Sequence, residues 1–228
     1  MGERESSTAL LIFTERPLVA SFDKPWLPSH IDNVRLHFKV ARHLEKLAFE
    51  LDVPFYIIDD RNQRGQCFQE RLYNAVSDIF DKGYSSVLTV GGDIPSLTTS
   101  ILKSAWQAMQ EGRNALGPTA DGGTYLIGLQ KGSFTTLKKH NIHWNKGKDF
   151  QELLRLLTDV PLFVSEPLVD WDTSLDMIED RKKNKSYFLW ALLFRAIFNF
   201  SCECIRPGYR LPISCYVLLT LYRGPPIR

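Results

Sequence analysis

The sequence predicts an α/β protein whose mostly parallel sheet is covered by helices on both faces. Through about the first 110 residues, short apolar runs rich in β-branched residues alternate with longer stretches in which apolar residues recur at helical spacing. Parallel strands need helical crossovers of this kind, and crossovers on both faces bury both sides of the sheet.

The individual elements follow from local patterns. Short apolar runs bounded by polar or turn-forming residues predict strands at residues 8–13, 54–58, 86–90, 114–118, 123–129 and 161–164. Stretches with an apolar stripe of helical period predict helices at residues 33–50, 67–82, 98–111 and 150–158. Pro17, Pro25 and Pro28 predict a loop over residues 14–32. In the first helix, the residues expected to face the core are Val34, Phe38, Ala41, Leu44 and Leu47.

The composition narrows the class of protein. The 228 residues suffice for one large α/β domain or for one domain with an appendage. A net charge of +2 gives no field that would attract nucleic acid. The polar start resembles no signal peptide, and no uninterrupted apolar stretch reaches transmembrane length. His37 and His43 are expected on a helix, as surface or interface residues rather than metal ligands. The cysteines lack zinc-site spacing and are expected to be reduced thiols of a cytoplasmic protein: Cys67, Cys202, Cys204 and Cys215.

The end of the sequence differs from the rest. From Tyr187 to Phe200 the chain is apolar almost all round, interrupted by Arg195. We expect a domain over residues 1–186 and an apolar C-terminal extension over residues 187–228. The extension would be buried on the domain, form a homodimer or touch a membrane surface, and the first two are favoured because the exposed patch would aggregate.

One carboxylate stands out in the first half of the chain. The predicted strand at 86–90 is followed by Gly91 and Gly92 and then by Asp93. Asp93 would therefore lie at the carboxyl end of a strand, where open α/β sheets bind ligands. A single carboxylate there suits Mg²⁺ or Mn²⁺, with phosphate oxygens and water as further ligands. The alternative is that Asp93 caps a helix beginning near Pro95.

Several motifs in a fixed order carry a resemblance to a known family. They lie at residues 11–25, 66–72, 91–97 and 116–129, with a weaker one at 169–176. Together they resemble the bacterial GT-A-fold, glycosyltransferase-like proteins called radical-SAM/selenodomain-associated transferases, formerly a domain of unknown function. The resemblance covers residues 8 to about 180 and implies a three-layer sandwich with a mostly parallel mixed sheet. It also implies a relationship in fold to sugar and cofactor nucleotidyltransferases.

The resemblance implies a metal-dependent site that binds phosphate. Asp93 would hold Mg²⁺ or Mn²⁺ with a second carboxylate from Asp170 or Asp172, which point to the same side of an extended segment. Asp121 and Lys24 would complete the catalytic group. Substrate would be bound by Thr14, Arg16, Arg71, Gly91, Gly92, Pro95, Gly122 and Gly123.

Each of these side chains also has a purely structural alternative. Lys24 fits a surface lysine in a proline-rich loop, and Arg71 fits a salt bridge with Glu70 or with a neighbouring helix. Asp172 fits a helix N-cap, with Asp176 in the first turn of that helix. The sequence Asp121–Gly123 also fits a plain hairpin turn.

The family pattern is altered at the phosphate-binding loop. The usual members carry Gly-x-x-Lys-Thr-Arg-Leu after the first strand, whereas residues 17–25 of this chain keep only Lys24. The Asp-Gly-Gly motif is followed by Thr124 instead of an aromatic residue.

The function that we expect is that of a metal-dependent transferase. It would use a nucleotide-sugar or nucleoside triphosphate donor, with glycosyl transfer slightly favoured over nucleotidyl transfer, and its small-molecule acceptor is not indicated. The alternative is a catalytically degenerate GT-A domain that acts as a binding or interaction module through its apolar tail.

Overall fold

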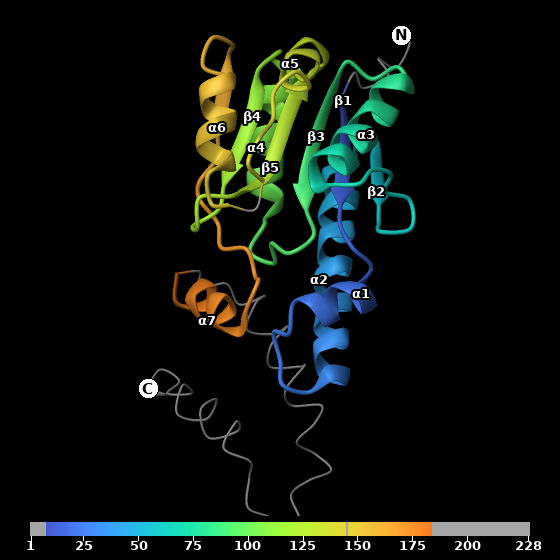
Figure 1. Cartoon of the computed structure of the whole chain (residues 1–228), viewed down its shortest axis with the longest axis vertical. Coiled ribbons are helices and arrows are strands. Elements are labelled where there is room, and N and C mark those ends of the chain that lie inside the picture. The colour runs from blue at the N-terminus through green and yellow to red at the C-terminus, as the bar shows by residue number, and fades with distance from the viewer. Residues whose placement is uncertain (1–7, 145, 184–228) are drawn as a thin grey trace, which may run out of the picture.

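A six-stranded mixed sheet forms the centre of the protein (Figure 1). The computed structural model describes residues 8–144 and 146–183. The strand order is β2-β1-β3-β5-β4-β6, and β5 runs antiparallel to both of its neighbours while the other pairs are parallel. The predicted mostly parallel sheet is therefore confirmed. The strands are β1 (Thr8–Phe13), β2 (Phe55–Ile58), β3 (Ser86–Gly91), β4 (Asn114–Pro118), β5 (Thr124–Gln130) and β6 (Leu162–Val164).

Helices cover both faces of this sheet, as the alternating pattern predicts. One face packs against α2 (His30–Leu51) and α4 (Thr99–Gln110). The other packs against α3 (Phe68–Asp81), α5 (Lys131–Leu137) and α6 (Asp149–Leu156). Along β1, side chains alternate between the two cores, since successive residues of a strand point to opposite faces. The first core receives Leu10 and Ile12, and the second receives Ala9, Leu11 and Phe13.

A third, smaller core lies below the carboxyl edge of β1 and β3 in Figure 1. It joins the loop after α1 (Pro17–Asp23) and the first half of α2 to the segment that leads into α7 (Ser174–Lys183). Trp26 and Trp171 meet edge to face with ring centroids 5.3 Å apart, and the Trp26 indole N–H donates to the Trp171 carbonyl at 2.6 Å. These contacts bring residues 24–26 and 170–172 side by side.

The prediction of an uninterrupted loop over residues 14–32 is wrong, because α1 lies within it. Pro17 occupies the start of α1, where its missing N–H removes no helical hydrogen bond. Helix α2 begins at His30, earlier than predicted, because the Ser29 side chain accepts a hydrogen bond from the Asp32 N–H. Helix α5 was not expected, because it is a short segment rich in glycine, serine and threonine, whereas α7 is the helix that the capping alternative at Asp172 and Asp176 implied.

The face of α2 that packs inward also differs from the prediction. Phe38 was expected in the core, but it is 51% exposed, while Leu36 and Val40 are buried with Leu44 and Leu47. Two neighbouring stripes share Leu44 and Leu47, so the helical period alone cannot choose between them. His37, expected at the surface or at an interface, is buried within the domain, and its ring stacks on that of Trp26 with centroids 3.6 Å apart.

The predicted extension over residues 187–228 lies outside the described residues, as do Cys202, Cys204 and Cys215. Cys67 is an exposed free thiol at the N-cap of α3. None of the helices within residues 8–144 and 146–183 is long and apolar enough to cross a membrane.

Candidate active site

A cavity of about 430 Å³ opens at the edge of the sheet where β1 and β3 end. The end of β4 and the first residues of β5 reach the same edge, because β5 is antiparallel. This is the edge at which open α/β sheets bind ligands, and the volume lies in the range of small-molecule sites. The predicted site residues that line the cavity are Thr14, Lys24, Arg71, Gly91, Gly92, Asp93, Asp121, Gly123, Asp170 and Asp172.

Asp93 projects into this cavity directly after β3. Its side chain is 30% exposed. Gly92 lets the chain pass close to β1, since a Cβ at this position would lie 2.7 Å from the Cβ of Thr14. The helix-capping alternative for Asp93 is wrong. Helix α4 begins only at Thr99, and its N-cap is Thr98, whose side chain accepts from the Ile101 N–H at 3.3 Å.

Lys24 connects two of the aspartates. Its ammonium contacts Oδ2 of Asp93 and lies 2.5 Å from Oδ1 of Asp172. The Lys24 side chain is only 27% exposed, so it is not the freely solvated surface lysine of the alternative. Burial by itself would lower the pKa of Lys24, but the carboxylates of Asp93 and Asp172 outweigh burial and hold that pKa above its ordinary value.

The carboxylate of Asp172 is available to the cavity because its neighbours cap α7. The N–H groups of Asp172 and Thr173 donate to Oδ2 of Asp176 at 3.2 and 2.7 Å, and the Leu175 N–H donates to Oγ1 of Thr173 at 3.2 Å. This reciprocal arrangement satisfies the free N–H groups at the start of α7. Thr173 and Asp176, rather than the side chain of Asp172, therefore accept the capping hydrogen bonds at the start of α7.

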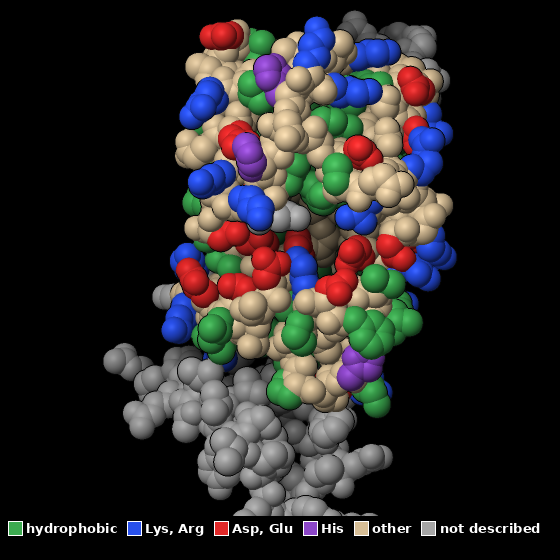
Figure 2. All heavy atoms as spheres, in the orientation of Figure 1, with side chains coloured by type: hydrophobic (Ala, Val, Ile, Leu, Met, Phe, Trp, Pro, Cys, Tyr) green, Lys and Arg blue, Asp and Glu red, His purple; other side chains and the backbone are tan. Residues whose placement is uncertain are grey.

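Asp170 lies on the same side of the chain as Asp172, as predicted from strand alternation, and lines the same cavity. Burial, together with the charges of Asp93, Asp121 and Asp172, raises the pKa of Asp170 to about 7. Figure 2 shows a band of acidic side chains, coloured red, across the middle of the molecule in this view. The site therefore holds more negative charge than Lys24 alone neutralises.

The turn between β4 and β5 supplies a further carboxylate. Oδ1 of Asp121 accepts a hydrogen bond from the hydroxyl of Thr119 and another, at 3.0 Å, from the Gly123 N–H. Gly122 has φ of +96° and packs on the backbone of Gly147, where a side chain would collide with the Gly147 carbonyl. A plain hairpin turn would not need two glycines. Here they fit because the turn packs closely against the loop that contains Gly147.

Arg71, on α3, also lines the cavity. The alternative of a salt bridge with Glu70 or with a neighbouring helix is not seen among the described residues, and the Glu70 carboxylate instead accepts from the Gln66 N–H at 2.7 Å. Nε of Arg71 is buried, and none of the described residues gives it a hydrogen-bond partner. A buried guanidinium nitrogen without a partner is costly and suits an anionic ligand that would supply one.

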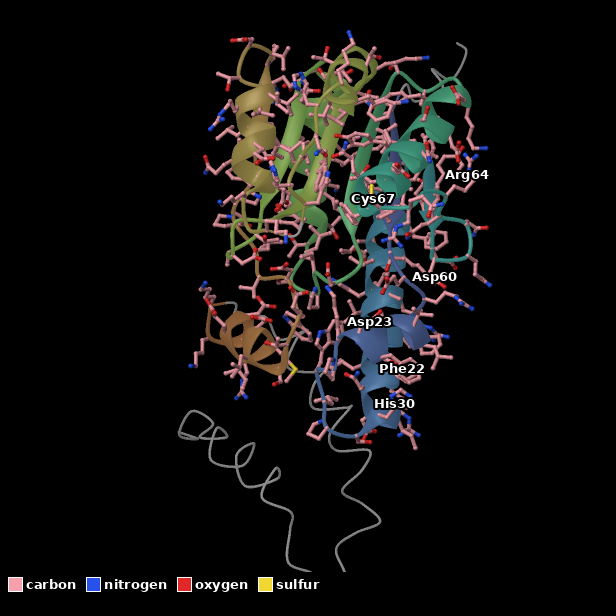
Figure 3. The ribbon with its side chains drawn as sticks, viewed as in Figure 1. Phe22, Asp23, His30, Asp60, Arg64 and Cys67 are labelled. Atoms are coloured by element: carbon pink, nitrogen blue, oxygen red, sulfur yellow. The ribbon has the colours of Figure 1, made fainter. Side chains whose placement is uncertain are left out.

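Three of the predicted substrate-binding residues do not line the cavity. Arg16 instead pairs with Asp60 at 2.8 Å, on the loop after β2 where Figure 3 labels Asp60. Pro95 lines a shallow groove beside α2, and Gly122 faces the backbone of Gly147. Adjacent motif residues point in different directions here, which the sequence order could not reveal.

Asp149 and Phe68 are among the residues of the cavity wall that sequence reasoning missed. Asp149, at the start of α6, is only 4% exposed, and burial raises its pKa. Its position in a polar, lysine-rich stretch gave no signal of burial. The ring of Phe68 lies 5.3 Å from that of Trp144 and forms an aromatic patch in the wall.

The aspartates also fit a divalent cation. Two carboxylate oxygens, one from Asp93 and one from Asp172, converge on a single point, which the Lys24 ammonium occupies. Mg²⁺ is characteristically held by one or two carboxylates, with substrate phosphates and water as its other ligands. Within residues 8–144 and 146–183, no three His, Cys, Asp or Glu residues form a complete protein cage for a metal. The arrangement thus suits an ion that binds together with phosphate.

Comparison with solved structures identifies the class of fold. A crystal structure from Desulfovibrio desulfuricans G20, described as a putative nucleotide-diphospho-sugar transferase, is 23% identical with a TM-score of 0.72. The superposition covers 83% of this chain and 95% of that chain. The chain therefore has the α/β fold of the nucleotide-diphospho-sugar transferase-like proteins, with a mixed, mostly parallel sheet.

The particular family follows from the sequence itself. Residues 32–146, half of the chain, match the family model described as "Uncharacterized protein conserved in bacteria (DUF2064)", and the chain belongs to this family. This finding confirms the resemblance to a bacterial transferase-like family of this fold. The match includes Arg71, Asp93 and Asp121, whereas Lys24 and the aspartates at 170 and 172 lie outside it. No curated protein matches the sequence.

More distant structural similarities extend over most of the chain. Rv0371c of Mycobacterium tuberculosis H37Rv, in complex with manganese, is 13% identical with a TM-score of 0.42, over 78% of this chain and 99% of that chain. CMP:2-keto-3-deoxy-manno-octonic acid synthetase, complexed with CTP, is 11% identical with a TM-score of 0.48, over 77% and 98%.

Proposed function

We propose that the protein is a transferase that uses Mg²⁺ or Mn²⁺ and a nucleotide-linked donor. The observation that carries this proposal is the imbalance of charge at the carboxyl edge of β3. Asp93, Asp121, Asp170 and Asp172 line the same cavity, and the pKa of Asp170 is raised to about 7 by burial and by the other three. A divalent ion that brings its own phosphate ligands would offset this charge.

Glycosyl transfer from a nucleotide-sugar is the reaction that we favour over nucleotidyl transfer from a triphosphate. Residues 17–23 form α1, and the chain there lacks the glycine and arginine of the usual phosphate-binding loop. Such a loop would grip a triphosphate, whereas a diphosphate carries fewer oxygens for the protein to hold. Lys24 and Arg71 remain in the cavity for that purpose.

Each residue then has a role that follows from its position. When bound, the metal would neutralise the diphosphate and stabilise the charge of the leaving group. Asp93 and Asp172 would hold the ion, and the guanidinium of Arg71 would bind an anionic group of the donor. Asp121 accepts a hydrogen bond from the hydroxyl of the acceptor and orients it. The remaining work is positioning, which supplies much of the rate enhancement in group transfer.

The alternative is a catalytically degenerate domain that serves as an interaction module. An interaction module of this kind would not require cationic side chains that line a cavity. Two cationic side chains line this cavity, Lys24 beside the aspartates and Arg71 with a buried Nε that has no partner among the described residues, and they favour the transferase.

Calorimetry tests the proposal. The wild-type protein is titrated with common nucleotide-sugars and nucleoside triphosphates, with and without Mn²⁺, alongside Asp93→Ala and the exposed control Asp159→Ala. We expect at least one donor to bind only with Mn²⁺, and this binding to be lost in Asp93→Ala but kept in Asp159→Ala. No metal-dependent binding of any donor, or binding unaffected by Asp93→Ala, would contradict the proposal.

A further inference from the structure

We infer that Lys24 is an internal counter-ion which occupies the cation position between Asp93 and Asp172, and that a divalent ion displaces its ammonium toward the phosphates of the donor. This inference rests on the proposed function for the existence of the metal site. It adds that metal and phosphate binding are coupled through one side chain.

The first argument is geometric. The Lys24 nitrogen contacts Oδ2 of Asp93 and lies 2.5 Å from Oδ1 of Asp172. A Mg²⁺ ion lies at about 2.1 Å from its carboxylate ligands, so the nitrogen and a metal ion would have nearly the same position. The two cations cannot occupy it together, and their like charges would repel strongly at such a separation.

The second argument concerns which part of Lys24 can move. Its backbone is held on both sides: its N–H donates to the Ala20 carbonyl at 2.8 Å, and its own carbonyl accepts from Asn33 Nδ2 at 3.1 Å and His37 Nε2 at 3.0 Å. The backbone contacts do not involve the four-carbon stem, which can rotate about its own bonds. The ammonium can therefore leave the aspartates without any change in the fold.

The third argument concerns where the ammonium would go. Lys24 and Arg71 line the same cavity as Glu15. Burial and the charge of Asp23 raise the pKa of Glu15, and the nearby charges of Lys24 and Arg71 offset that rise only in part. A diphosphate held near Arg71 would therefore present oxygens within the same cavity as the displaced ammonium. A metal ion alone must compete with Lys24, whereas a metal ion with diphosphate gives Lys24 a new partner.

Measurement of Mn²⁺ binding by electron paramagnetic resonance tests this coupling on the full chain. Lys24→Met removes the charge and keeps an apolar stem, and Lys24→Arg keeps the charge. The matched control is Lys46→Met, because Lys46 lies on α2 in an exposed pair with Glu50 and changes the net charge equally. We expect Lys24→Met to bind Mn²⁺ alone at least about tenfold more tightly than wild type, since a competing like charge is removed. The other two variants should stay close to wild type.

Inorganic pyrophosphate supplies the opposite readout. The preformed complex of Mn²⁺ with pyrophosphate should bind Lys24→Met about tenfold more weakly than wild type, because the displaced ammonium is missing. If Lys24→Met binds Mn²⁺ more tightly and the Mn²⁺–pyrophosphate complex more weakly, the metal displaces the Lys24 ammonium. A general effect of the substitution on the fold would weaken both. Lys24→Met that binds Mn²⁺ no more tightly than wild type would overturn the inference.

A second measurement needs no variant. Acylation of individual lysines in the wild-type protein, followed by mass spectrometry, should show Lys24 becoming more reactive when Mg²⁺ is added, while Lys46 does not change. Unchanged reactivity of Lys24 at saturating Mg²⁺ would also overturn the inference. Asp93→Asn separates the two proposals: if Mn²⁺ binding of the wild type does not depend on Asp93, the proposed function fails as well.

Discussion

The backbone N–H of Trp171 donates a hydrogen bond of 3.0 Å to the carbonyl of Asp93. This contact ties the loop after β3 to the segment that carries Asp170 and Asp172, one residue on either side of Trp171. The Trp171 indole N–H donates in turn to Oδ2 of Asp180 at 2.9 Å, and its carbonyl accepts from Trp26. The separation of the aspartates is therefore set by a buried tryptophan rather than by their own loops.

Replacement of this tryptophan should affect both stability and metal binding. Trp171 is buried, so Trp171→Phe removes the indole N–H donor and leaves a cavity in the core. Both effects together should lower the free energy of unfolding by about 2 kcal/mol. Loss of the support behind the aspartates should weaken Mn²⁺ binding by about tenfold. Urea unfolding and an Mn²⁺ titration measure the two effects. The control is Trp106→Phe on α4, which should leave Mn²⁺ affinity unchanged; equal affinities in the wild type and Trp171→Phe would contradict the role of this residue.

Gly92 should tolerate no side chain. In Gly92→Ala the new Cβ would overlap the side chain of Thr14, so β1 and the loop after β3 must separate. We expect a loss of about 2 kcal/mol in unfolding free energy, as in other overpacked sites, together with weaker donor binding. Gly132→Ala is the matched control, because nothing lies within 4 Å of its Cβ position in α5 and alanine favours a helix. The expectation fails if both variants unfold at the same denaturant concentration.

Asp170 should make the metal-free protein less stable as the pH rises. Its pKa is raised from an ordinary value of 3.8 to about 7, so between these values the folded protein binds more protons than the unfolded chain. The contribution of Asp170 to stability is therefore complete below pH 4 and is lost as the pH rises through about 7. Asp170→Asn should match the wild type near pH 4 and exceed its stability at pH 8.

Denaturant unfolding of the wild type and of Asp170→Asn from pH 4 to pH 8, in the presence of a chelator, measures their difference in unfolding free energy. The change of this difference with pH reports the titration of Asp170. Saturating Mn²⁺ should reduce this difference, because a nearby cation favours the ionised carboxylate. A constant difference from pH 4 to pH 8 would show that Asp170 titrates normally.

Arg71 should contribute to binding at the expense of stability. Arg71→Met removes a guanidinium whose Nε is buried without a partner among the described residues, so the free energy of unfolding should stay level or rise. Binding of Mn²⁺ with pyrophosphate should weaken by about tenfold or more, while Mn²⁺ alone should bind as before. In the control Arg64→Met, an exposed pair with Asp78 is lost and both quantities should change little. Unchanged pyrophosphate binding in Arg71→Met would exclude it as an anion-binding group.

Elements whose residues carry a clear local pattern of apolar side chains and turn-forming residues could be predicted from the sequence. Strand β3 reads as a buried run because both of its faces are covered, and Gly91, Gly92 and Asp93 mark its end. The position of Asp93 at the ligand-binding edge could therefore be predicted. Helix α1 could not, since it is short and is held by its packing on α2 rather than by its own helical propensity.

The convergence of charges is the part that local pattern does not contain. Lys24 and Asp172 are far apart in the sequence and meet because Trp26 and Trp171 pack together. Strand alternation placed Asp170 and Asp172 on one side, but it gave no information about which loop they would face. The same limit explains Arg16, which follows β1 closely and yet turns to Asp60 instead of the cavity.

The most direct test of the central claim is a crystal structure of the full chain with Mn²⁺ and a nucleotide-sugar that binds in calorimetry. We expect an anomalous peak about 2.1 Å from a carboxylate oxygen of Asp93, in contact with the diphosphate, and the Lys24 ammonium moved from the aspartates to phosphate oxygens. A manganese ion bound elsewhere, with Lys24 still between Asp93 and Asp172, would contradict the account.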